Sequence, residues 1–206
     1  MFAPASIARI LRPLPRIPSA TPVYTGTYTT TTDETATLFT DVNIGEPHPK
    51  RLVIVTVYKG GTGTGSVRVG SAGNFFISAV DFNEVGIWYL ALPAGETMDI
   101  LVSSLGSVRK AMSLYAYYPQ SPLMIASASG TAGAGTAAGA ALGNQNRGGG
   151  CIIYAGCQHI VVGTLAVTWS GLAGETPIED VDANLEAAAT YMTGHLNLVA
   201  TALSPN

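Results

Sequence analysis

Hydrophobic and polar positions alternate along much of the chain, and this period of two is typical of half-buried β-strands. The apolar positions are rich in β-branched and aromatic residues, and Gly, Pro and Asn interrupt the pattern at short intervals. Many short strands separated by such turn signals favour an all-β fold, an antiparallel β-sandwich or jelly-roll-like body. The pattern predicts strands over residues 23–32, 35–44, 51–60, 66–70, 74–80, 85–92, 97–104, 109–118, 151–157 and 159–171.

Two of these segments carry more specific expectations. Residues 51–60, RLVIVTVYKG, form the most apolar run of the chain, which predicts a central strand covered on both faces. Residues 85–92 and 97–104 are separated only by PAGE, a loop built on Pro and Gly. This spacing predicts a β-hairpin.

The C-terminal part is ambiguous between helix and strand. Residues 175–182, ETPIEDVD, read as an acidic turn region. After it, LEAAATYM has the propensity for two helical turns. In a chain of strands we expect instead two closing β-strands, with Thr193, Gly194 and His195 as the turn between them.

Two segments differ in composition from the strands. Residues 1–22 hold three arginines, five prolines and no acidic residue, and prolines favour extended conformations that lose little entropy on docking. We expect residues 1–22 to be an extended docking arm and residues 23–206 to be the sandwich body, with a long Gly/Ala-rich loop or arm over 127–150. A short amphipathic helix over Ala5–Arg12 is an alternative for the leader.

The expected partner-docking residues of the arm combine apolar side chains with guanidinium groups that pair with carboxylates. They are Phe2, Ile7, Arg9, Ile10, Leu11, Arg12, Leu14 and Arg16.

Charge narrows the function classes. Only 11% of the 206 residues are charged, against about 25% in an ordinary soluble domain, which favours a subunit buried among other proteins. The net charge is −3, and because the leader carries +3, the body carries −6. Such a body lacks the basic balance of a nucleic-acid-binding domain. No apolar run is long enough for a transmembrane helix, and prolines interrupt the leader too often for a signal peptide.

Candidate catalytic and metal chemistry is sparse. Cys151 and Cys157 would lie about 20 Å apart on one strand, too far for a disulfide, so we expect two small buried hydrophobic side chains; a metal half-site of Cys157 and His159 is the alternative. There is no G-x-S-x-G nucleophile motif and no phosphate-binding glycine motif. We therefore expect no enzyme activity, no cofactor and no metal site.

Five acids lie close together near the C-terminus. Their density suits a hard cation such as Ca²⁺, but the spacing is not that of an EF-hand, and we expect a solvated loop and strand edge that discourages aggregation. They are Glu175, Glu179, Asp180, Asp182 and Glu186.

Consecutive aromatic residues divide between the two faces of a strand, so that one of each pair points outward. Outward rings pack in the core of a subunit contact or stack on sugar rings. The pairs are Phe75 with Phe76, Trp88 with Tyr89, and Tyr117 with Tyr118.

Three segments in succession, RLVIVTVYKGG, VGIWYLALPAGETMDILVSS and VTWSGLAGETPIEDVDANLEAAATYMTGHLN, resemble a β-sandwich type that recurs in structural proteins of tailed bacteriophages and related gene-transfer particles. The shared motifs fall at Leu52–Tyr58, Ile87–Gly95 and Thr168–Asp182. The chain departs from the type by extra residues, AGETPI, between Leu172 and Glu179. The resemblance implies a virion component and carries over no catalytic or binding residue.

These observations predict a non-enzymatic bacteriophage virion structural protein: a minor capsid, head-decoration or spike-type subunit that docks through its N-terminal arm. Its expected partners are copies of itself and other virion proteins of the capsid, portal, neck or tail, with neither nucleic acid nor membrane. A carbohydrate-binding host-attachment module of a fibre or tail, recognising a surface glycan, is the alternative. An unrecognised hydrolase is a third hypothesis.

Overall fold

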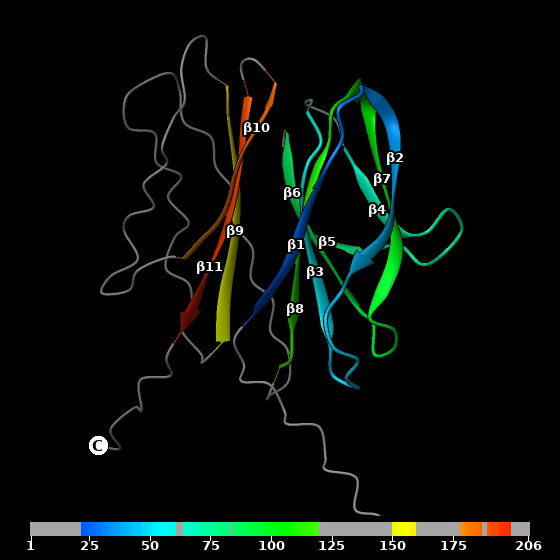
Figure 1. Cartoon of the computed structure of the whole chain (residues 1–206), viewed down its shortest axis with the longest axis vertical. Helices are drawn as coiled ribbons and strands as arrows, with labels where there is room; N and C mark the ends of the chain where they lie inside the picture. The colour runs from blue at the N-terminus through cyan, green and yellow to red at the C-terminus, as the bar shows by residue number, and fades with distance from the viewer. Residues whose placement is uncertain are drawn as a thin grey trace, which may run out of the picture.

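The computed structural model describes residues 22–60, 64–82, 84–119, 150–159, 178–186 and 189–198. These residues form strands and no helix (Figure 1), and hence no helix that could span a membrane. The strands are β1 (Val23–Thr29), β2 (Glu34–Asn43), β3 (Leu52–Tyr58), β4 (Ser66–Val69), β5 (Ile77–Phe82), β6 (Val85–Ala91), β7 (Thr97–Val108), β8 (Ala111–Tyr117), β9 (Gly150–His159), β10 (Ile178–Glu186) and β11 (Ala189–Leu198).

The strands form three antiparallel sheets in the described part of the chain. A five-stranded sheet has the order β1-β8-β3-β6-β5, and the two three-stranded sheets have the orders β2-β7-β4 and β10-β11-β9. The five-stranded sheet lies between the other two (Figure 1). The predicted antiparallel all-β sandwich is therefore confirmed, and a third sheet is added to it.

The pairing of the first eight strands has a simple order. β1 pairs with β8, β2 with β7, and β3 with β6. Just before β5, Phe75 forms a β-bridge with Arg68 of β4, and the Phe76 amide donates to the Val67 carbonyl at 2.8 Å. Strands β1, β2 and β3 thus pair with β8, β7 and β6 in mirror order, and β4 contacts the residues that lead into β5.

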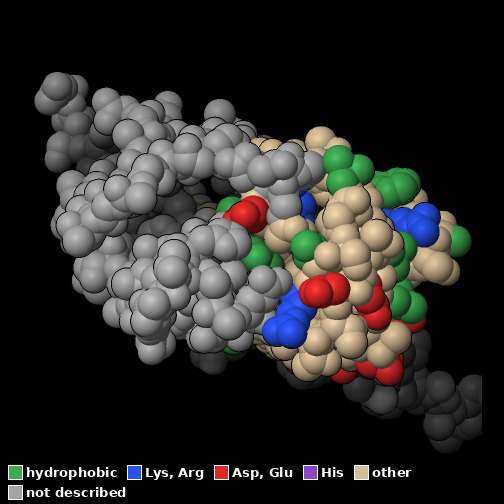
Figure 2. Space-filling model, turned by 90° about the horizontal axis from the view of Figure 1, so that it is seen from above, with side chains coloured by type: hydrophobic (Ala, Val, Ile, Leu, Met, Phe, Trp, Pro, Cys, Tyr) green, Lys and Arg blue, Asp and Glu red, His purple; other side chains and the backbone are tan. Residues whose placement is uncertain are grey.

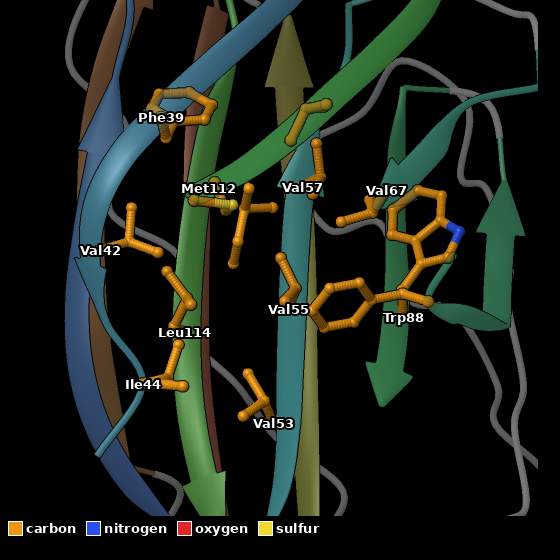
Figure 3. Packing of buried hydrophobic residues seen from close by; sticks show 13 residues of the cluster. Phe39, Val42, Ile44, Val53, Val55, Val57, Val67, Trp88, Met112 and Leu114 are labelled. Carbon is orange, nitrogen blue, oxygen red and sulfur yellow. The ribbon is translucent and has the colours of Figure 1, made fainter. Parts of the chain in front are cut away.

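One face of the five-stranded sheet packs against β2-β7-β4 and forms the hydrophobic core. Val55 of β3, Leu114 of β8 and Trp88 of β6 point into it, and Val42 of β2 approaches from the other sheet (Figure 3). Ile100 of β7 belongs to the same core. These side chains are buried. The β-branched residues that gave the sequence its strand propensity thus fill the space between two pleated surfaces.

The opposite face of the same strands carries hydroxyl groups. Thr56 of β3 is the sequence neighbour of Val55, so its side chain points the other way. There the buried Tyr191 hydroxyl of β11 lies 2.6 Å from Thr56 Oγ1 and donates to the Thr56 carbonyl at 3.0 Å. A second bond runs from the Tyr115 hydroxyl to Thr193 Oγ1 at 2.9 Å. The sheet β10-β11-β9 is therefore attached by buried hydrogen bonds.

Residues 51–60 behave as expected. β3 is hydrogen-bonded on both sides, to β6 and to β8, and six of its seven residues are buried. The prediction of a central strand covered on both faces is confirmed.

The predicted hairpin of residues 85–92 and 97–104 is wrong. β6 pairs with β3 and β5, whereas β7 pairs with β2 and β4, so the loop between them crosses from one sheet to the other. The buried Arg51 side chain holds this loop, because its guanidinium donates to the carbonyls of Leu92 and Ala94, both at 2.7 Å, and also to that of Gly45. A side chain distant in the sequence thus overrides the short spacing.

The C-terminal strands are longer than expected. Residues 178–182 of the predicted acidic turn belong to β10, an edge strand. The predicted turn at residues 193–195 is also wrong, because Thr193, Gly194 and His195 pair within the ladder of β11 and β9. β11 has partners on both sides, which fixes the register through this glycine. The preference for strands over helix is confirmed for residues 189–198, and Gly150 of the expected 127–150 loop begins β9.

The lack of a side chain at Gly86 makes room for Trp88. A Cβ atom at position 86 would lie 2.3 Å from an indole ring carbon of Trp88 and 2.8 Å from the Val80 carbonyl oxygen. We expect Gly86→Ala to displace the ring and lower the free energy of unfolding by about 1–3 kcal/mol, measured by urea denaturation. Gly106→Ala is the control, because its new methyl group would meet only Val108, at 3.9 Å. Equal stability of the two variants would contradict this packing.

Removal of one hydroxyl tests the attachment of the third sheet. Burial raises the pKa of Tyr191, so its hydroxyl stays protonated as a donor. We expect Tyr191→Phe to lower the free energy of unfolding by about 1–3 kcal/mol, because Thr56 then loses a buried partner. Tyr89→Phe is the control because the Tyr89 ring is only half-buried, and it should change the free energy of unfolding by less than about 0.5 kcal/mol. An unchanged free energy of unfolding for Tyr191→Phe would argue against a buried hydrogen bond between Tyr191 and Thr56.

Candidate functional site

A row of side chains crosses the outer face of the sheet β2-β7-β4. Leu38 of β2 is directly opposite Leu101 of β7, which is opposite Arg68 of β4, and Arg68 bridges to Phe75. Directly opposed residues lie on one face of an antiparallel sheet. The neighbouring row of Phe39, Ile100 and Val69 faces the core, so the row with Leu38 and Phe75 points away from it.

The chain turns a corner immediately after this row. Residues 75 and 76 pair with β4, whereas Ile77 pairs with Tyr89 of β6 in the five-stranded sheet. Phe75 therefore ends the outer row of one sheet, and Ile77 lies at the edge of the next. We call Leu38, Arg68, Phe75, Ile77 and Leu101 the corner patch.

The corner patch is apolar and exposed. The exposed fractions are 59% for Phe75, 54% for Ile77 and 43% for Leu38. Several hydrophobic side chains are visible on the surface of the described part of the chain (Figure 2). Exposed apolar residues that gather on one face mark surfaces for other molecules more often than isolated ones do.

Arg68 supplies the charge in this patch. Its guanidinium carbon lies 5.8 Å from the centre of the Phe75 ring, a cation–π contact. No carboxylate of the described residues lies within 4.0 Å of it. Asp99, two residues before Leu101 and on the same outer face, is exposed, and one of its oxygens accepts the Asp41 amide at 3.0 Å. The face therefore carries one cation and one anion around its apolar row.

A buried ion pair holds the corner in place. Asp81 of β5 lies 3.0 Å from the ammonium nitrogen of buried Lys59, which follows β3. The other Asp81 oxygen accepts the Gly65 amide at 3.0 Å, just before β4. Gly65 is needed here because a Cβ would lie 2.7 Å from the Lys59 side chain. One carboxylate thus ties together the ends of three strands.

The predicted docking residues of the arm, from Phe2 to Arg16, lie outside the described residues, as do Glu175 and most of the 127–150 segment. Glu179, Asp180, Asp182 and Glu186 lie on β10. Cys151 and Cys157 both lie on strand β9, as expected. Among the side chains that the structure describes, no three His, Cys, Asp or Glu groups gather as metal ligands would.

The expected division of aromatic pairs holds for two of the three. Phe76 and Trp88 are buried while Phe75 is exposed and Tyr89 half-buried. Tyr117 and Tyr118 are both buried, which overturns the expectation for that pair. Tyr118 lies beyond the end of β8, where its hydroxyl donates to the Glu46 carbonyl at 3.0 Å and its ring meets His48 edge-on. Neither Trp88 nor Tyr118 offers an open ring face to a sugar.

The corner patch was partly visible in the sequence. The alternation in NFFISAV predicted that Phe75 and Phe76 point to opposite sides, but not which of them points outward. Leu38 and Leu101 are 63 positions apart, and only the register of β2 with β7 brings them together.

Searches of family models, curated proteins and solved structures each found no match to this chain.

The importance of Asp81 can be tested by truncation. We expect Asp81→Ala to lower the free energy of unfolding by about 3–5 kcal/mol, because it removes a carboxylate that pairs with the buried Lys59 charge. Urea denaturation measures the loss. Asp33→Ala is the control, because the Asp33 carboxylate is exposed and lies 4.0 Å from the Arg109 guanidinium. It should lower the free energy of unfolding by less than about 1 kcal/mol. Similar losses for the two variants would refute an anchoring role for Asp81.

Proposed function

We propose that the chain is a non-enzymatic structural protein of a virion, a minor capsid, head-decoration or spike-type subunit whose body is a jelly roll and whose residues 1–22 are a docking arm. The observation that carries the proposal is the pairing order of the first eight strands. A jelly roll is a long antiparallel ribbon rolled up on itself, so that strand 1 pairs with 8, 2 with 7, 3 with 6 and 4 with 5. Viral capsid proteins are among the proteins built this way.

The first three pairings are present as ladders, and the fourth is reduced to a short contact. β1 with β8, β2 with β7 and β3 with β6 run over most of their lengths. The pairing of strand 4 with strand 5 is reduced to the bridge between Arg68 and Phe75. After this bridge the chain pairs with β6. This order favours a jelly roll over a sandwich of the immunoglobulin type, whose seven strands pair differently.

The surface supports a role in assembly. Three of the few charged side chains, Arg51, Lys59 and Lys110, are buried. The apolar corner patch, by contrast, is exposed to solvent. A protein whose outside is covered by neighbouring subunits tolerates such a surface better than a free monomer does. Lectins also use the jelly roll, but the Trp88 and Tyr118 rings are buried and offer no face to a glycan.

The proposed arm joins the body next to an edge strand. Pro22, the last residue of the proposed arm, is buried and precedes β1, which is an edge strand of the five-stranded sheet. Proline-rich segments with apolar and guanidinium side chains dock with a small loss of conformational entropy. An acidic and apolar groove on another virion protein is the partner that this composition fits.

Deletion of residues 1–21, which spares buried Pro22, tests the arm. We expect the truncated chain to fold with an unchanged urea midpoint but to be lost from particles, because the docking contacts are gone. Co-sedimentation with particles, followed by immunoblotting, measures incorporation, and a chain with Arg9, Arg12 and Arg16 replaced by Ala should show a partial loss.

Two outcomes of that experiment count against the proposal in different ways. Full incorporation of the truncated chain would refute the docking arm alone. Absence of the full-length chain from purified particles would refute the virion role itself.

A further inference from the structure

The corner patch lies where the chain passes from the edge of one sheet to the edge of the next. Exposed strand edges are normally blunted by charges or bulges. Edge strand β2 has both, with Glu34 and Asp41 and a bulge between Phe39 and Val42. Edge strand β10 carries four acids. β5 also carries an acid, Asp81, and a bulge between Ser78 and Val80, but residues 74–77 before them are uncharged and expose Phe75 and Ile77.

The charges near the patch are complementary to each other. Arg68 has its guanidinium over Phe75 and no carboxylate of the described residues beside it, while exposed Asp99 lies on the same outer face. A surface that carries an apolar row, a cation and an anion on one face is complementary to a second copy of itself. Contacts around a two-fold axis use one patch on both subunits, so each charge finds its opposite across the axis.

We infer that a second copy of this chain docks on the corner patch. Phe75, Ile77 and Leu38 of each copy are covered by the other, and Arg68 of each copy pairs with Asp99 of the second copy. Phe75 and the arginine beside it are of residue types that are enriched in the cores of such interfaces. The inference rests on the proposed structural role and names the partner of this face.

The experiment measures self-association of the purified full-length chain by sedimentation velocity over a range of concentrations. We expect reversible dimers, and we expect Phe75→Asp to raise the dissociation constant by at least about 30-fold, the effect of losing one central contact residue. Leu105→Asp is the matched control. Leu105 is the most exposed large apolar residue described, at 76%, but lies outside the patch near the end of β7, so the dimer should be unchanged.

A charge exchange tests the pairing across the axis. Arg68→Glu and Asp99→Arg should each weaken the dimer about 10-fold, since each places like charges together, and the double variant should restore it to within about 3-fold of the original. Urea denaturation of each variant verifies that it is folded, which matters for Asp99 because it also accepts the Asp41 amide.

The outcomes separate cleanly. A chain that stays monomeric at all concentrations overturns the inference, and so does a dimer unaffected by Phe75→Asp. A dimer lost equally in Phe75→Asp and Leu105→Asp also overturns it. Failure of the double variant to restore the dimer refutes the pairing of Arg68 with Asp99. None of these results touches the arm, whose deletion is scored on particles, so this inference and the proposed function fail separately.

Discussion

The structure depends on one strand pair, β3 with β8, being buried on both faces. Side chains of a strand alternate between faces, so Val55 and Leu114 must point into the core while Thr56 and Ser113 point away from it. Any apolar element could pack on an apolar outward face. A buried hydroxyl such as that of Thr56, however, needs a hydrogen-bond partner in the element that covers it. Tyr191 meets this demand from β11 at 2.6 Å, and the Thr27 hydroxyl of β1 meets Ser113 at the same distance. Chemistry that alternates along two strands thus decides which elements can cover the central sheet.

A second constraint acts at the ends of the strands, where carbonyl groups turn inward and need donors. The chain meets it with buried cations. Arg51 binds three carbonyls of two loops, and the Lys110 ammonium donates to the carbonyls of Glu34 and Val108. Burial lowers the pKa of both groups, which means that folding disfavours their charged forms, and the carbonyl oxygens offset part of this cost. Because these cations are buried, fewer charged groups lie on the outer surface.

These two constraints explain what the sequence could and could not predict. Alternation is local, so the strands themselves and the opposite orientations of Phe75 and Phe76 followed from it. Pairing is not local. The short loop after β6 suggested a hairpin, yet Arg51, some forty positions away, holds that loop across the two sheets. The same holds at Thr193, where a glycine and a histidine read as a turn but pair with β9. Tyr118 was assigned to a face by alternation although it lies beyond the strand, where alternation no longer applies.

The corner patch contains exposed apolar side chains that neither of these two constraints requires. At the crossing from β4 to β6 the chain must send one aromatic ring inward to close the core, and Phe76 does this with its amide held by the Val67 carbonyl. Alternation then forces Phe75 outward, whatever its chemistry. A polar residue there would satisfy every need of the isolated body, because the outer face requires nothing apolar. The exposed Phe75 ring, with the Arg68 guanidinium over it, is therefore not required by the packing of the core. The second copy of this chain proposed above would cover both side chains.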